Sequence, residues 1–97
     1  MSDDFFAPPP FKPDDALQRA QRELRALGLT AREGRFEKQG VAVARVAIDG
    51  DVLKAGLVRK IIRTPEWQER TLKDHGALRS FIADVKKRLA STGGDDD

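Results

Sequence analysis

The sequence predicts a small α+β domain: an antiparallel sheet with an N-terminal and a C-terminal helix packed on one of its faces. Three observations lead to this fold class. Apolar residues recur at helical spacing over residues 14–27 and 75–90, near the two ends of the chain. Between these segments lie short runs rich in β-branched residues, separated by Gly-containing pairs that favour turns. The 97 residues leave room for a single core, so we expect the order α-β-β-β-α.

The first helix is expected over residues 14–27. Pro13 suits the first helical turn, and Asp14 and Asp15 stand where the helix dipole favours negative charge. Gly28 is well placed to end the helix. One apolar stripe would face the core, and it consists of Leu17, Ala20, Leu24 and Leu27.

Three strands are expected over residues 33–38, 41–48 and 51–58, in an antiparallel meander. Asp49-Gly50 lies between the last two of these segments and predicts a type I′ hairpin turn, which needs positive φ at both central residues. Residues 51–62 fit a helix almost as well as a strand, and the sequence leaves both alternatives open. The apolar face of such a helix would consist of Leu53, Leu57, Val58, Ile61 and Ile62.

The region before the last helix is ambiguous in the same way. Thr64-Pro65-Glu66 resembles a helix start, although it could open only a single turn around Trp67. Residues 69–72 could then be extended and add a fourth strand to the sheet. Asp74 is expected to cap the final helix, over residues 75–90. The apolar face of that helix consists of Leu78, Phe81, Ile82, Val85 and Leu89.

The charged residues are unevenly distributed, although the formal net charge is only +2. Residues 1–15 and 92–97 each sum to −3, whereas residues 16–91 hold 17 basic and 9 acidic side chains. Acidic ends therefore bracket a basic body, which is informative about partners rather than about fold. We divide the chain into a Phe/Pro-rich N-terminal arm (residues 1–12), a single α+β domain (residues 13–90) and a disordered acidic tail (residues 91–97).

The sequence shows little catalytic chemistry. It has no cysteine and a single histidine, His75, so no metal-ligand set is visible. The serines do not stand in a nucleophile-elbow pattern, and the glycines are dispersed rather than gathered in a phosphate-binding loop. We expect a protein that is not an enzyme, with no cofactor, no metal and no small-molecule substrate. Because no apolar run approaches membrane-spanning length, we expect no membrane partner. The acidic residues at the N-terminus are unlike a secretory signal and cysteine is absent, so we expect a cytoplasmic location.

The basic body indicates a surface for the nucleic-acid backbone, because Arg and Lys bind phosphates. The alternative is that these side chains are an ordinary solvated coat, with many paired to Asp or Glu. Few aromatic residues are interleaved with the cations, so base stacking has little support from the sequence. The candidate binding residues are Arg19, Arg22, Arg25, Arg32, Arg35, Arg45, Arg59, Lys60 and Arg63.

A second hypothesis is a protein-interaction module or a homodimer. The segment FFAPPPFKP, residues 5–13, holds four of the five prolines and three of the five phenylalanines. Such a stiff, apolar segment could pack on the domain's own core, bind an aromatic groove of a partner, or remain a free tail. An open sheet edge is another possible interaction surface, because its unpaired backbone N–H and C=O groups can pair with a second chain. The candidate interaction residues are Phe5, Phe6, Phe11 and Trp67.

The predicted α-β-β-β-α order is similar to that of the double-stranded-RNA-binding domain. The similarity is one of topology. That family carries a Lys-rich motif at the start of its last helix, whereas the corresponding stretches here, TPEWQER or KDHGALR, contain acidic residues. No residue roles are therefore carried over from that family.

Overall fold

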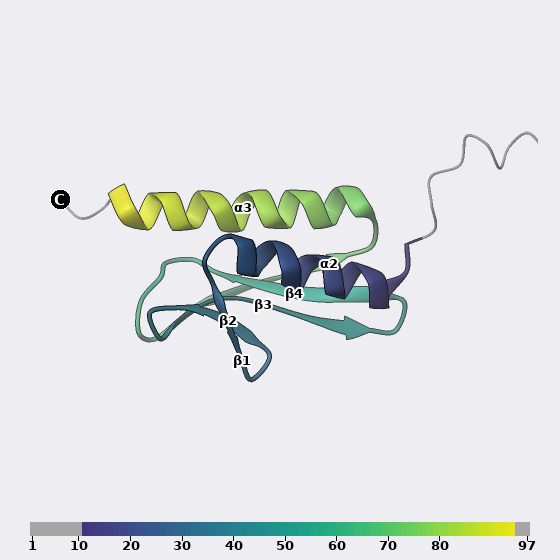
Figure 1. The fold of residues 1–97 in the computed structure, drawn as a ribbon, viewed down its shortest axis with the longest axis horizontal. Coiled ribbons are helices and arrows are strands. Elements are labelled where there is room, and N and C mark those ends of the chain that lie inside the picture. The colour runs from purple at the N-terminus through teal and green to yellow at the C-terminus, as the bar shows by residue number, and fades with distance from the viewer. Residues whose placement is uncertain (1–10, 95–97) are drawn as a thin grey trace, which may run out of the picture.

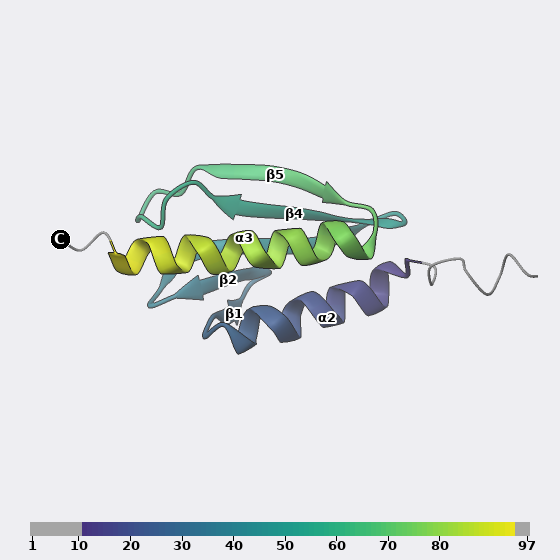
Figure 2. The same cartoon turned by 90° about the horizontal axis from the view of Figure 1, so that it is seen from above.

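The computed structural model describes residues 11–94 of the chain. An N-terminal and a C-terminal helix lie on the same side of one antiparallel sheet, and no helix of the described residues lies over the opposite face (Figure 1). The strands neighbour one another in sequence order, from β1 at one edge to β5 at the other (Figure 2). The predicted fold class is confirmed. The elements are α2 (Pro13–Ala26), β1 (Thr30–Arg32), β2 (Arg35–Lys38), β3 (Val41–Asp49), β4 (Val52–Val58), β5 (Trp67–Leu72) and α3 (His75–Gly94).

The sheet has five strands rather than the three or four that we expected. The predicted strand over residues 33–38 is wrong at its start, because Glu33 and Gly34 form a turn between β1 and β2. Both residues have positive φ, of 51° and 80°, which is the backbone conformation of a type I′ hairpin turn. Gln39-Gly40, between β2 and β3, repeats this geometry with φ of 55° and 83°.

The hairpin turn at Gly40 gives a stability prediction. An L-residue with a side chain pays about 1–2 kcal/mol in the left-handed region, so Gly40→Ala should lower the free energy of unfolding by about that amount. Gly76→Ala is the matched control. Gly76 lies in the first turn of α3, and an added Cβ there would meet nothing nearer than an oxygen of Asp74 at 3.4 Å. This control should be neutral or stabilising by at most about 0.5 kcal/mol, because alanine has its full advantage over glycine only in a helix interior. Urea unfolding measures both changes, and equal effects of the two substitutions would contradict the turn assignment.

The ambiguous segment after β3 is a strand, so the helical alternative for residues 51–62 is wrong. Six residue pairs align β4 with β3 and six align it with β5, which places β4 in the interior of the sheet. The turn before it is centred on Gly50 and Asp51, since Asp49 pairs with Val52. Of these two central residues only Gly50 has positive φ, so the type I′ turn that we expected at Asp49-Gly50 does not form there.

The predicted helix start at Thr64-Pro65-Glu66 is also wrong. Residues 59–66 connect β4 to β5 without a helix, and the Arg59 N–H donates to the Glu66 carbonyl oxygen at 2.9 Å. Residues 69–72 are extended, as the sequence allowed, and the strand begins earlier, at Trp67. The edge strand β5 was hard to predict because its residues WQERTL are polar on both faces, although Leu72 is buried.

A second irregularity of the sheet lies between β2 and β3. Phe36 pairs with Ala44 while Glu37 pairs with Ala42, so one residue of β3, Val43, is left opposite no partner. This is a β-bulge, and bulges bend a strand and increase its twist. The β1–β2 hairpin is accordingly turned toward the side of the sheet away from the helices (Figure 1).

The core lies between the helices and the covered face of the sheet. Phe81, Leu78 and Val85 of α3 are buried against the strands, and Ala20 and Leu24 of α2 have no exposed surface. The Asp74 carboxylate caps α3 as expected, because it accepts a hydrogen bond from the Ala77 backbone N–H at 2.7 Å. The helix continues to Gly94, beyond its expected end at residue 90. In the described part of the chain no helix is both long and apolar enough to cross a membrane.

Candidate nucleic-acid interface

The candidate site lies on the face of the sheet that is turned away from the helices. Successive residues of a strand point to opposite faces. Leu53, Ala55 and Leu57 of β4 belong to the core, so Lys54, Gly56 and Val58 point to the other side. We call that side the open face. Through the register of the sheet it receives the following residues from the other strands: Arg32, Arg35, Glu37, Arg45, Ala47, Asp49, Trp67, Glu69 and Thr71.

Three arginines stand directly opposite one another on the open face. Arg32 of β1 pairs with Arg35 of β2, and Arg35 pairs in turn with Arg45 of β3. We call these three residues the arginine row. Neighbouring strands are about 4.8 Å apart, so the row spans about 10 Å of backbone. Like charges placed opposite each other are unfavourable in a sheet, although Arg45 is also paired with Glu69.

The β-bulge creates the arginine row. At the hairpin end of β2 and β3, Lys38 pairs with Val41. Without the extra residue, that register would place Ala44 opposite Arg35. The bulge shifts the pairing by one residue, so that Arg45 takes this position. The irregularity therefore has a direct consequence for the charge of the open face.

Gly56 continues the line of the arginine row into β4, and Glu69 ends it in β5. The absence of a side chain at Gly56 leaves space for two large neighbours. A Cβ added there would lie 3.0 Å from Arg45 Nε and 3.0 Å from Trp67 Cε3. Glycine within a strand often marks such a close approach.

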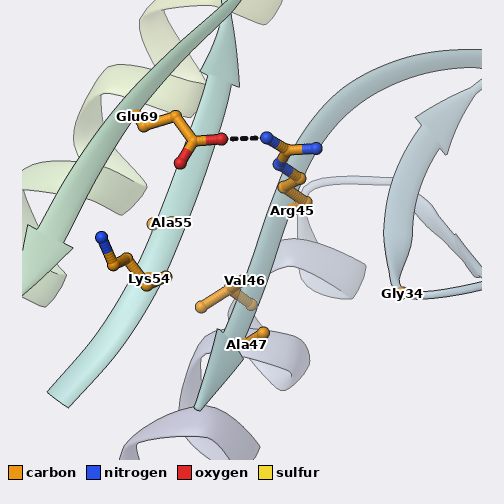
Figure 3. Close-up of a pocket in the computed structure, with 7 residues that line it drawn as sticks. All are labelled: Gly34, Arg45, Val46, Ala47, Lys54, Ala55 and Glu69. Atoms are coloured by element: carbon orange, nitrogen blue, oxygen red, sulfur yellow. Dashed lines mark hydrogen bonds and ion pairs between the residues drawn. The ribbon is translucent and has the colours of Figure 1, made fainter. Parts of the chain in front are cut away.

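Arg45 reaches across this gap and makes two contacts. Its guanidinium carbon lies 4.5 Å from the centre of the Trp67 ring, which is a cation–π geometry. Its Nη2 donates to a carboxylate oxygen of Glu69, as Figure 3 shows. The Arg45–Glu69 ion pair remains accessible to solvent, since 41% of the Arg45 side chain and 53% of the Glu69 side chain are exposed. Arg45 and Trp67 thus form one stacked pair on the open face, in which the guanidinium lies over the ring.

The turned β1–β2 hairpin makes one side of the open face concave. A hollow of about 240 Å³ lies there, and it extends from the hairpin turn at Gly34 to Glu69 on β5 (Figure 3). Arg45 and Lys54 supply positive charge to its wall, and Glu69 supplies negative charge. The hollow is shallow and ionic, which suits a charged chain lying along the surface better than an enclosed apolar molecule.

The β4–β5 connection adds three more of the predicted cations. Arg59, Lys60 and Arg63 are all exposed in residues 59–66. Trp67 directly follows this segment and pairs with Val58, so the connection lies at the end of the sheet where Trp67 stands. The arginines of β1 and β2 lie toward the opposite edge. Neither Arg32 nor Arg35 forms an ion pair with any residue in the range that the structure describes.

The three arginines predicted on the first helix do not join this surface. Arg19, Arg22 and Arg25 belong to α2, on the covered side of the sheet (Figure 2). Arg19 is paired with Glu23, at 3.2 Å between Nε and Oε2. The nine predicted basic residues are therefore divided between the two sides of the sheet, and no single face collects all of them.

Of the aromatic residues predicted for interaction, Phe5 and Phe6 lie outside the described residues. Phe11 packs against the protein's own core and meets the His75 ring edge-on, with ring centroids 5.4 Å apart. Both ring nitrogens of His75 are buried and have no hydrogen-bond partner among the residues that the structure describes. Trp67 lies on the open face, half-buried beside Arg45.

Two contributors to the interface were missed at the level of sequence. Gly56 was not singled out, because a lone glycine in a strand is common, and Glu69 was expected only as one of the acids that pair with the basic side chains. Their importance depends on the register that aligns them with Arg45. Across the described range, no three His, Cys, Asp or Glu side chains gather in a way that could hold a metal ion.

Comparison with known proteins finds no matching family model, no matching curated protein and no matching solved structure.

Proposed function

We propose that this protein binds single-stranded nucleic acid on its open face. The observation that carries the proposal is the arginine row, which ends in the Arg45–Trp67 stack on a sheet face without helical cover. Cations that track a backbone, together with planar groups that stack bases, are the two components of single-strand recognition. In this respect the structure supports base stacking more than the residue composition did.

Each part of the interface has a distinct task in this proposal. Arg32 and Arg35 bind phosphates, for which the planar guanidinium is well suited. Trp67 and the guanidinium plane of Arg45 stack with bases. A phosphate that approaches Arg45 competes with Glu69 for the same N–H groups. The carboxylates of the open face thereby weaken non-specific contact, and binding needs the stacking contribution as well as charge.

The test is a titration of fluorescently labelled oligonucleotides with the full chain, followed by polarisation. A mixed-sequence single strand of about 12 nucleotides should bind more tightly than the duplex of the same sequence, because paired bases are not free to stack. Affinity should fall as salt rises, since phosphate neutralisation releases counterions. Equal affinity for strand and duplex would contradict the stacking role, and no binding at low salt would overturn the proposal as a whole.

A second candidate function is pairing with a protein through the edge strand β5. Within the described residues this strand has a neighbour on one side only, and alternate residues of the strand point their backbone N–H and C=O groups to the other side. Self-pairing around a two-fold axis would place Glu69 opposite Glu69, or Arg70 opposite Arg70, of the second copy. Like charges opposite each other are unfavourable, so this edge suits a different protein chain better than a homodimer. Sedimentation of the pure protein as a monomer is the result that we expect.

A further inference from the structure

A second charged hollow lies on the covered side of the sheet, between the edge strand and the last helix. It measures about 430 Å³ and is lined mainly by polar and charged side chains. It is separate from the open face, because Gln68 and Arg70 alternate with Trp67 and Glu69 along β5. Its lining residues are Leu57 of β4, Gln68 and Arg70 of β5, and Asp84, Lys87 and Arg88 of α3.

Arg70 is held in place at this hollow by two contacts. Its Nη1 lies 2.9 Å from the Asp84 carboxylate. Its guanidinium carbon lies 5.5 Å from the centre of the Phe81 ring, and Phe81 itself is fully buried. A side chain anchored in this way loses less conformational entropy when it binds a ligand. One third of the Arg70 side chain is exposed, at 33%, so its remaining N–H groups can reach a ligand.

The charge of the lining residues indicates the class of ligand. Three of the six lining residues, Arg70, Lys87 and Arg88, are cationic and one, Asp84, is anionic, so the lining favours an anionic ligand. A phosphate monoester carries about −1.5 to −2 at pH 7, whereas a phosphodiester carries one negative charge. The Gln68 amide supplies a neutral donor, and the buried Leu57 closes the hollow on the sheet side. We propose that this hollow binds the phosphate group of a small phosphate monoester.

In this site Arg70 offers paired N–H donors and Lys87 offers a point charge from the facing helix. Arginine binds phosphate oxygens in a bidentate manner, and lysine complements it without a fixed orientation. Lys87 is exposed, and its neighbour Lys86 is equally exposed but does not line the hollow. The two lysines therefore form a matched pair, of the same residue type and on the same helix, for testing the site.

The experiment titrates the isotope-labelled full chain with inorganic phosphate and follows the backbone amides by NMR, at an ionic strength held constant with sodium chloride. Saturable shifts should concentrate on β5 and on α3 around Lys87. Lys87→Ala should weaken the apparent affinity about fivefold, the upper end of what an exposed ion pair contributes, and Lys86→Ala should leave it unchanged. Arg70→Lys keeps the positive charge but removes the planar guanidinium with its paired N–H donors. This substitution should also weaken phosphate binding.

Two further probes separate possible sources of the phosphate group. Glycerol 2-phosphate, a monoester, should shift the same amides as inorganic phosphate, and dimethyl phosphate, a single-charge diester, should bind clearly more weakly. Equal effects of Lys86→Ala and Lys87→Ala, shifts that do not saturate, or equal binding of the diester would each overturn the proposal. Trp67→Ala should leave phosphate binding intact, so this result is independent of the function proposed for the open face.

Discussion

Replacing Phe81 by alanine is expected to lower the free energy of unfolding by about 3–5 kcal/mol, the largest loss of stability that we predict for this protein. The ring has no exposed surface and lies in the middle of α3, where it packs on the covered face of the sheet. Its removal leaves a cavity between two layers and takes away the aromatic face under Arg70. The rigid strands around this position cannot close such a cavity fully, so the cost includes lost contacts as well as lost burial.

The consequence of that loss depends on how stable the whole domain is. A chain of this length has a free energy of unfolding of about 5–15 kcal/mol, so Phe81→Ala should be partly unfolded at room temperature if the total lies at the lower end. Urea unfolding followed by circular dichroism measures the change. Ile62→Ala is the control, because its side chain is exposed in the β4–β5 connection, and its effect should stay within about 0.5 kcal/mol. A change below about 1 kcal/mol for Phe81→Ala would contradict the packing of α3 on the sheet.

Trp67→Ala is expected to have the largest effect on nucleic-acid affinity. Stacking of a base on an aromatic side chain contributes about 1–3 kcal/mol, which corresponds to about 5-fold to 150-fold weaker binding of a single strand. The substitution also removes the ring that holds the Arg45 guanidinium in place. Duplex binding, which depends on phosphates alone, should change much less.

The controls for this prediction come from the same surface. Arg35→Ala removes one cation from the arginine row and should weaken strand and duplex binding together, with a shallower dependence on salt. Arg22→Ala removes an arginine of α2, on the covered side, and should have little effect on either ligand. If Trp67→Ala retains full affinity for the single strand while Arg35→Ala loses it, the open face binds phosphates without stacking.

The helices could be predicted from the sequence because their apolar stripes are long and their ends carry recognisable signals. Pro13 and Gly28 mark the limits of α2, and Asp74 caps α3 through its side chain. The hairpins were harder, since Glu33-Gly34 and Gln39-Gly40 adopt the backbone conformation more typical of Asn-Gly or Asp-Gly. The Asp49-Gly50 pair carries the stronger signal but does not supply the two central residues of its turn.

The residue types of the candidate site could be predicted from the sequence, but their arrangement on the sheet could not, for a different physical reason. Residue types reveal how many cations a chain has, but strand register decides which of them meet. The β-bulge at Val43, the one unpaired residue between β2 and β3, brings Arg45 opposite Arg35. The local sequence contains no signal that predicts this bulge. The helical spacing of Arg19, Arg22 and Arg25 was equally visible, yet the side of the sheet on which α2 packs separates them from the arginine row.

The most direct measurement of the central claim uses Trp67 itself, because it is the only tryptophan in the chain. Its intrinsic fluorescence reports from within the proposed interface without any label. The full chain would be titrated with an unlabelled single strand and, separately, with its duplex at near-physiological salt. Stacking predicts saturable quenching by the single strand and a much smaller change with the duplex. Unchanged Trp67 fluorescence at strand concentrations that saturate the polarisation assay would contradict the claim that the open face binds the strand through this residue.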